Sequence, residues 1–207
     1  TGLKSYRLTI FDNLPRTGLP AEFNSYAEYQ RHMQILINAG VMEDSTKIWW
    51  DLRPSARYPT LETRIMDVCT RMDDAISLAA LLVSTIRMLY RLRLNNQRWR
   101  DYSPMLIREN RWRAMRYSFD EGLIDFGIGS IVPFEQLLDE LIELTFEDAK
   151  SLGCELEVAA TKDILSRGTS AHRQLKTYQL SMDAGQNHED ALKDVVDMLI
   201  NETAADL

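Results

Sequence analysis

The sequence predicts an α+β fold that is predominantly helical, and two observations carry this prediction. Apolar residues recur every three or four positions over much of the chain, which is the spacing of one face of a helix. Residues 48–53 and 60–68 instead alternate with a period of two, which is the spacing of a strand. No repeat and no low-complexity linker interrupts the pattern, so we expect a single domain over residues 1–207.

Capping residues mark several of the expected helices. Ser25 followed by Glu28 forms a capping box, and Gly40 stands where a glycine commonly ends a helix. Pro133 suits the first turn of a helix that runs to about Leu152. Two more helices are expected after Gly168 and from Asn187, and residues 93–104 are expected to form a loop.

A further helix is expected from Asp73 or Asp74 to about Leu92. Residues 76–83 within it are apolar nearly all round, which is typical of a helix that is buried on every side. No apolar run reaches the roughly 18 residues that cross a membrane. We therefore expect no membrane partner.

Composition narrows the class of protein. A formal net charge of −7 and a pI near 5.1 argue against a nucleic-acid platform or an anionic membrane surface. Two cysteines, Cys69 and Cys154, have no metal-type spacing and do not suggest a disulfide scaffold, so a reducing cytoplasm is the expected compartment. His32, His172 and His188 are isolated in the sequence.

The two alternating segments hold the most informative polar residues. Glu62 and Arg64 are two residues apart, so in a strand their side chains point the same way, and Arg53 lies on the polar face of the preceding strand. If the strands pair as a hairpin, a carboxylate and two guanidiniums converge. Carboxylate oxygen binds Mg²⁺, and the guanidinium fork matches phosphate oxygens.

The same three residues also fit a cross-strand salt bridge on a solvated sheet face. Spacing alone favours that structural interpretation, because a short motif carries a high risk of false matches. A closed salt-bridge cluster would weaken the prediction of a phosphate or metal site, and an open cleft would strengthen it.

Residues 53–67 read RPSARYPTLETRIMD and resemble the signature of the bacterial carboxylate–amine ligase family, the second type of glutamate–cysteine ligase. That signature is R-P-S, a short gap and T-x-E-x-R-x-x-D, and every fixed position is filled. Other segments resemble family segments in the same order: SYR at 5–7, LPRTGLP at 14–20, IWWD at 48–51, ENRWRA at 109–114 and RGT at 167–169. One departure is Ser118, where a glycine is more usual, which puts the local backbone shape in question.

The resemblance implies the C-terminal part of a glutamine-synthetase-like fold, with a few antiparallel strands packed against a helical bundle. It implies ATP and Mg²⁺ as cofactors, and activation of a glutamate-like carboxylate as an acyl phosphate that a cysteine-like amine attacks, as in glutathione biosynthesis. Glu62 would then be a metal ligand, Arg53 and Arg64 would be catalytic, and Arg53 and Arg57 would face the nucleotide phosphates. Cations are needed where the new negative charge develops.

Further residues are assigned less directly. Arg7 and Arg16 lie in family-like motifs and could bind a substrate carboxylate or pair with local acids such as Asp12. Arg111, with Asn110, is a candidate for substrate binding on a helix. Arg113 is expected to be structural, paired with Glu109.

Two family patterns, G-x-E-x-E and H-x-H, are missing from the sequence. In the family they lie in the N-terminal half and supply further metal ligands. The resemblance therefore implies that this chain is the C-terminal half, that the N-terminal half is its partner, and that the chain alone is inactive. A homo-oligomer is a further expected partner, and a non-catalytic helical scaffold is the alternative function.

Overall fold

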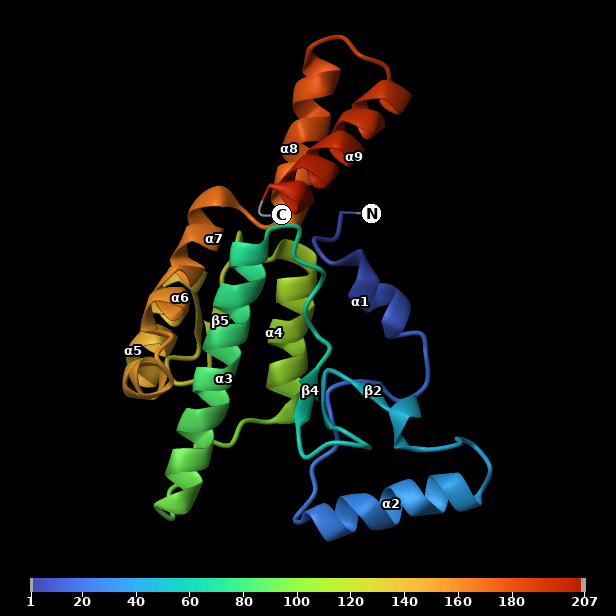
Figure 1. Ribbon diagram of the computed structural model, residues 1–207, viewed down its shortest axis with the longest axis vertical. Helices are drawn as coiled ribbons and strands as arrows, with labels where there is room; N and C mark the ends of the chain where they lie inside the picture. Colours follow the sequence, from blue (N-terminus) through green and yellow to red (C-terminus); the bar gives the residue numbers. More distant parts are fainter. Residues whose placement is uncertain (1, 206–207) are drawn as a thin grey trace. The chain divides into compact units, whose positions relative to one another are not determined.

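The computed structural model describes residues 2–205, and its helices and short strands confirm the predominantly helical α+β class (Figure 1). The helices are α1 (Tyr6–Phe11), α2 (Tyr26–Asn38), α3 (Met72–Leu94), α4 (Pro104–Tyr117), α5 (Phe134–Leu152), α6 (Glu155–Ala159), α7 (Thr161–Arg167), α8 (Ser170–Asp183) and α9 (His188–Ala204), with a 3₁₀ turn η1 (Ser45–Lys47). The strands are β1 (Thr17–Gly18), β2 (Trp49–Trp50), β3 (Leu52–Pro54), β4 (Leu61–Thr63), β5 (Leu123–Asp125) and β6 (Ser130–Val132).

The described chain groups into two compact units. Unit 1 comprises residues 5–67, and unit 2 comprises residues 2–4 and 68–205. Unit 1 is therefore inserted between two parts of unit 2 along the sequence. The single domain expected over residues 1–207 stays a prediction, and each unit is described by itself.

Unit 1 is built around α2 and four short strands. Ser25 caps α2 by accepting a hydrogen bond from the Glu28 amide at 3.1 Å, and Gly40 follows the last turn with φ +70°. One face of α2 supplies the buried side chains of Tyr29 and Met33. The core of the unit consists of Tyr29, Met33, Met42 and Ile48, with Phe23, Leu36, Ile37 and Trp50 packed against it.

The strands of unit 1 pair in two ways. β1 and β2 are parallel, whereas β3 and β4 are antiparallel. The predicted hairpin is thus present, although its strands are shorter than the alternating segments because regular pairing stops at Pro54 and Thr63. This hairpin carries the predicted site.

Unit 2 is a helical bundle in which α3 packs against α5, α6 and α7 (Figure 1). Ala80, Ala149 and Val158 form its core, with Leu81, Ile142 and Cys154 packed around them. Asp148 on α5 is 2% exposed and accepts bidentate hydrogen bonds from the guanidinium of Arg91 on α3. The ion pair fixes how α3 is rotated against α5.

The prediction that α3 is buried on every side is wrong. Ile76 and Val83 are each 47% exposed, and Tyr90 is 63% exposed. By length and composition α3 is also long and apolar enough to cross a membrane, a test that core helices of soluble proteins pass as well. Arg87 and Arg91 interrupt the apolar run of α3, and the expectation of no membrane partner, like the cytoplasmic location, stays a prediction.

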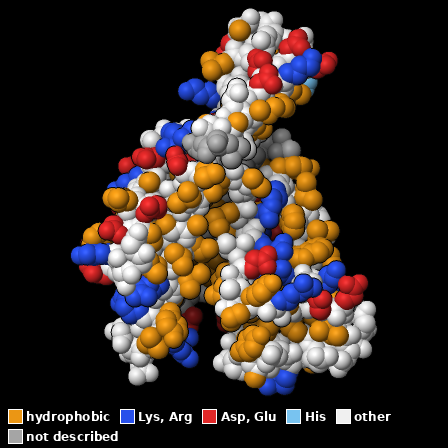
Figure 2. Space-filling view, viewed as in Figure 1, with side chains coloured by type: hydrophobic (Ala, Val, Ile, Leu, Met, Phe, Trp, Pro, Cys, Tyr) orange, Lys and Arg blue, Asp and Glu red, His pale blue; other side chains and the backbone are white. Residues whose placement is uncertain are grey.

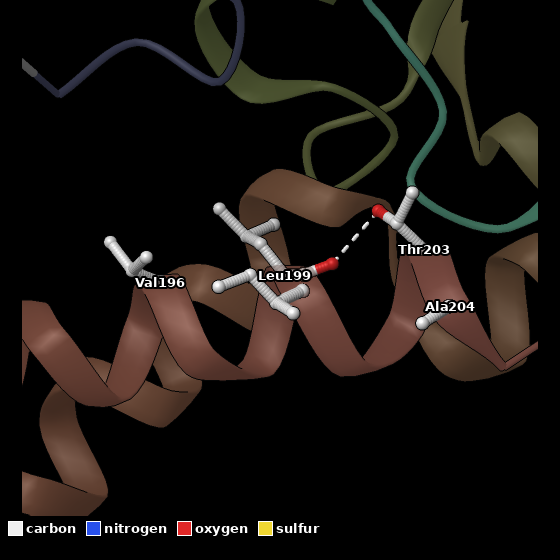
Figure 3. A pocket seen from close by; sticks show the side chains of 5 residues that line it. Val196, Leu199, Thr203 and Ala204 are labelled. Atoms are coloured by element: carbon white, nitrogen blue, oxygen red, sulfur yellow. Dashed lines mark hydrogen bonds between the residues drawn. The ribbon is translucent and has the colours of Figure 1, made fainter.

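Helices α8 and α9 form an antiparallel hairpin (Figure 1). Asn187 caps α9, as predicted, by accepting a hydrogen bond from the Asp190 amide at 3.0 Å. Arg173 on α8 binds Glu202 on α9 at 2.6 Å. A shallow apolar hollow lies on α9 between Val196 and Ala204 (Figure 3).

Helix α4 is held to the β5–β6 hairpin by side chains that bond to backbone. The Asn110 amide donates to the Ile124 carbonyl and accepts from the Ile124 amide, both at 2.8 Å. Arg113 donates to the Glu121 and Gly122 carbonyls. Arg113 is thus structural, as predicted, but these carbonyls are its partners where Glu109 was expected.

Candidate functional site

The predicted site is the β3–β4 hairpin, in which Arg53 lies directly opposite Glu62. Ser55 begins the connecting loop, and its hydroxyl accepts hydrogen bonds from the amides of Arg57 and Tyr58. Glu62 lies at the centre of β4, and Arg64 follows directly after the strand. The local sequence therefore places the acid between the two guanidiniums.

Arg53 is a buried anchor in this structure. It is 7% exposed, and its Nη1 donates to the carbonyls of Thr46 at 2.7 Å and Ile48 at 2.5 Å. Its Nε and Nη2 donate to Glu62 Oε2 at 3.1 and 2.8 Å. Arg53 thus ties η1 to the hairpin and orients Glu62, rather than presenting its nitrogen atoms to an open surface.

Glu62 bridges the two guanidiniums. Its Oε1 lies 2.8 Å from Arg64 Nη2, while Oε2 binds Arg53. Burial alone would raise the pKa of Glu62, but the hydrogen bonds and positive charges of Arg53 and Arg64 outweigh it, so the pKa lies below its usual value. Glu62 is therefore ionised at neutral pH. Arg53, Glu62 and Arg64 form the cross-strand salt-bridge cluster that the sequence also allowed.

Arg7 extends the cluster to α1. Its Nη2 donates to the Arg64 carbonyl at 2.8 Å, and its Nη1 lies 3.8 Å from Asp67. The Ser5 hydroxyl donates to the same Asp67 carboxylate at 3.1 Å. Arg64 Nε and Arg7 Nη1 are buried nitrogens without a hydrogen-bond partner, and both are closed off from solvent. The part of the Arg64 side chain that an anion can reach is its exposed remainder, 29% of the side chain.

The remaining predicted arginines are placed differently. Arg16 has a positive φ of 62° and donates from Nε to the Lys47 carbonyl at 3.1 Å, so it also supports η1. Arg57 is exposed in the loop between β3 and β4. Arg111 is half-buried on α4 and belongs to unit 2, whereas the other site residues belong to unit 1.

The signature residues therefore sit together on a hairpin, and the sequence around them matches a family model throughout. The model of glutamate–cysteine ligase family 2 matches residues 1–198. The chain belongs to glutamate–cysteine ligase family 2. Relatives named "Putative glutamate--cysteine ligase 2" are 58% identical in Rhodospirillum rubrum, 56% in Jannaschia sp. and 55% in Ruegeria pomeroyi, each over all 207 residues.

The chain spans about half the length of the curated relatives it matches. It covers 53% of the R. rubrum protein and 54% of the Jannaschia protein. Activity, substrates and partners of the whole family protein are therefore argued as proposals for this chain.

A divalent metal needs more oxygen ligands than the described residues bring together. Glu62 is a suitable ligand type, but both of its oxygens are engaged by arginines. Within residues 2–205 no group of three or more His, Cys, Asp or Glu side chains could hold a metal ion. These residues alone do not make a Mg²⁺ site.

Sequence reasoning missed a second polar cluster, in unit 2. His172 Nε2 lies 2.9 Å from Asp120, its Nδ1 lies 2.7 Å from the Thr169 hydroxyl, and Phe119 stacks on its ring at 4.6 Å. Thr169 and His172 form a capping box at the start of α8. The T-x-x-H spacing could have revealed this pair, but nothing in the sequence reveals Asp120, which is 52 positions away. His172 is thus not isolated.

Proposed function

We propose that this chain carries part of the active site of an ATP-dependent carboxylate–amine ligase. The enzyme would activate a glutamate-like carboxylate as an acyl phosphate and join it to a cysteine-like amine. The observation that carries the proposal is the filled family signature folded as a hairpin, with Glu62 held between Arg53 and Arg64. Membership of glutamate–cysteine ligase family 2 supports the reaction class.

The geometry divides the roles among the arginines. Arg53 is fully engaged with η1 and Glu62, so we assign it to positioning rather than to direct phosphate contact. The Arg64 side chain is 29% exposed and Arg57 is exposed in the loop, so these two are the candidates for phosphate or carboxylate binding. Arg7 beside Arg64 and Arg111 on α4 remain the proposed substrate-binding residues, whereas Arg16 supports η1.

ATP and Mg²⁺ are the proposed cofactors. Together they would supply the phosphoryl group and neutralise its negative charge. Glu62 would be one metal ligand, and the others would come from the part of the relatives' polypeptide that this chain does not match. We therefore expect the chain alone not to turn over substrate.

A full-length chimera tests the proposal. It joins this chain, in the natural order, to the part of the R. rubrum protein that the chain does not match. ATP-dependent amide formation is measured for the chimera and for the chain alone across a panel of amino acids. Amide formation by the chimera alone supports the proposal, robust turnover by the isolated chain refutes the need for the other half, and a folded but inactive chimera refutes the ligase activity.

A non-catalytic scaffold is the second candidate, and the closed Arg53–Glu62–Arg64 cluster favours it. The two candidates differ in their response to Glu62→Gln in the chimera. If Glu62 binds metal, amide formation falls by about 100-fold or more. If Glu62 is structural only, this variant lowers the melting temperature and leaves turnover per folded molecule unchanged. Glu43→Gln is the matched control, because Glu43 is 84% exposed in an ion pair with Lys47.

A further inference from the structure

Helix α3 buries its less apolar face. The residues of α3 that are buried against the rest of unit 2 are Asp74, Ser77, Ala80, Ser84 and Met88. Small and polar side chains thus dominate this contact. This is the reverse of the usual arrangement, in which a helix of a bundle turns its most apolar face inward.

The apolar side chains lie on another face, which we call the α3 seam. The seam consists of Ile76, Ala79, Val83, Ile86 and Tyr90. Its spacing alternates between three and four residues over about 21 Å, as in the contact positions of a coiled coil, and Arg87, which pairs with Asp148, lies at its edge. Figure 2 shows hydrophobic side chains gathered along α3.

Ion pairs prevent α3 from rotating to bury the seam. Near its start, Asp74 is 5% exposed and binds Arg167 of α7. Near its end, Arg91 binds Asp148 of α5 at 2.7 Å. Rotation would break both pairs and leave buried carboxylates unpaired, which is strongly destabilising. The seam is therefore held outward by the bundle itself.

The length of the relatives indicates what covers this seam. The chain accounts for only 53% of the R. rubrum protein, so nearly half of a homologous polypeptide is available as a covering partner. We propose that the α3 seam is the surface on which that unmatched part of the ligase polypeptide docks, through an apolar element of its own. This inference rests on family membership and on chain length, and it does not depend on the reaction proposed above.

A bilayer fits the helix less well than a protein partner does. Asp74 and Arg91 lie within α3, and both are engaged in ion pairs with neighbouring helices. Charged groups of this kind are costly in hydrocarbon. The seam occupies only one side of the helix, which suits packing against another helix or sheet.

Hydrogen exchange of the chimera and of the isolated chain tests the proposal. Backbone amides of residues 76–90 are expected to exchange about tenfold more slowly, or more slowly still, in the chimera. Equal exchange in the two proteins would overturn the proposal, whether because the seam stays open in both or because unit 1 already covers it.

A pair of variants separates docking from general stability. Val83→Asp places a charge in the middle of the seam, so it should lower the melting temperature of the chimera by about 5 °C or more and that of the isolated chain by much less. Leu156→Asp is the matched control, because Leu156 on α6 is 79% exposed and lies outside the seam. It should affect the two proteins equally.

Three results would overturn the proposal. The first is a Val83→Asp effect of equal size in the isolated chain and the chimera. The second is a dimer of the isolated chain, seen in sedimentation, that Val83→Asp dissociates, since a second copy would then be the partner. The third is protection of residues 76–90 by phosphatidylcholine–phosphatidylglycerol vesicles in the absence of the other half. Ligase turnover is not a readout in any of these measurements, so failure of the proposed reaction leaves this test intact.

Discussion

The backbone conformation at Ser118 explains why glycine is usual at this position in the family. It has a φ of +56° and a ψ of −121° at the end of α4, a region that residues other than glycine rarely adopt. The resemblance had identified glycine as the usual residue at this position. The structure supplies the reason, because the chain needs a left-handed bend there and serine adopts it under strain.

Replacing Ser118 with glycine should therefore stabilise the protein by about 0.5–1 kcal/mol. Glycine adopts positive φ without steric cost, and this gain exceeds the extra entropy of the unfolded chain. Urea denaturation followed by circular dichroism measures the change. Ser166→Gly inside α7 is the control and should destabilise by about 1 kcal/mol, because Ser166 is helical. A loss of stability for Ser118→Gly would contradict the argument.

The environment of Glu202 predicts how the stability of the fold depends on pH. Burial alone would raise its pKa, but hydrogen bonds from Arg173 and Thr70 outweigh this and hold the pKa below its usual value. A carboxylate whose pKa is lower in the folded than in the unfolded state stabilises the fold at pH values above its ordinary pKa. That contribution is lost as the pH falls through the lowered folded value.

Glu202→Gln should therefore lower the stability at pH 7 by about 1–2 kcal/mol and have much less effect near pH 3. Denaturation of both proteins at the two pH values measures the difference. Glu189→Gln is the control, since Glu189 is 82% exposed in its pair with Lys193 and should matter little at either pH. An equal effect of Glu202→Gln at both pH values would show that the ionised form is not what stabilises the α8–α9 hairpin.

At the scale of elements, the sequence predicted what local chemistry determines. The capping of α2 by Ser25 and of α9 by Asn187, and the pairing of residues 52–54 with 61–63, depend on neighbouring residues and were confirmed. The outward face of α3 was not predicted, because it depends on ion pairs with Arg167 and Asp148, which are distant in sequence. For the same reason the sequence could place Arg53 beside Glu62 but could not show that η1 carbonyls occupy its other donors.

The β5–β6 hairpin was also missed, because its strands read LID and SIV and the residues around them do not alternate between apolar and polar. Gly122 precedes β5 with a φ of +65°, and a Cβ atom there would lie 2.2 Å from the Val132 carbonyl oxygen. Side chains at this position therefore collide with β6 backbone. The close approach of the two strands requires glycine.

Gly122→Ala should destabilise the protein by about 2–4 kcal/mol, because both the backbone conformation and the contact with Val132 oppose a Cβ atom. Gly185→Ala is a matched control: Gly185 has a φ of +86°, but nothing lies within 4 Å of its Cβ position, so only the conformational cost of about 1 kcal/mol is expected. Thermal melts of the two variants give the comparison. Equal losses would mean that β6 moves away from Gly122 at little cost.

At the scale of the whole molecule, the chain leaves unit 2 at residue 4 and returns to it at residue 68. Lys4 belongs to unit 2, where its amide donates to the Met115 carbonyl at 3.0 Å and its ammonium lies 3.2 Å from Asp120. The two ends of unit 1 meet at the bond between Ser5 and Asp67, 3.1 Å long. An insertion whose ends are this close can in principle be removed without stretching the host.

Replacing residues 5–67 with a short Gly/Ser linker should therefore leave unit 2 folded. Its core of Ala80, Ala149 and Val158 and the ion pair between Arg91 and Asp148 lie wholly within residues 68–205. We expect a cooperative thermal transition and slow hydrogen exchange in α3, α5 and α6 of the shortened protein. Arg91→Ala, made in both the shortened and the complete chain, is the control: it should lower the melting temperature of both by a similar amount, because the pair with Asp148 is internal to unit 2. A shortened protein that melts without cooperativity would show that unit 2 needs unit 1 in order to fold, and that residues 1–207 behave as the single domain that the sequence predicts.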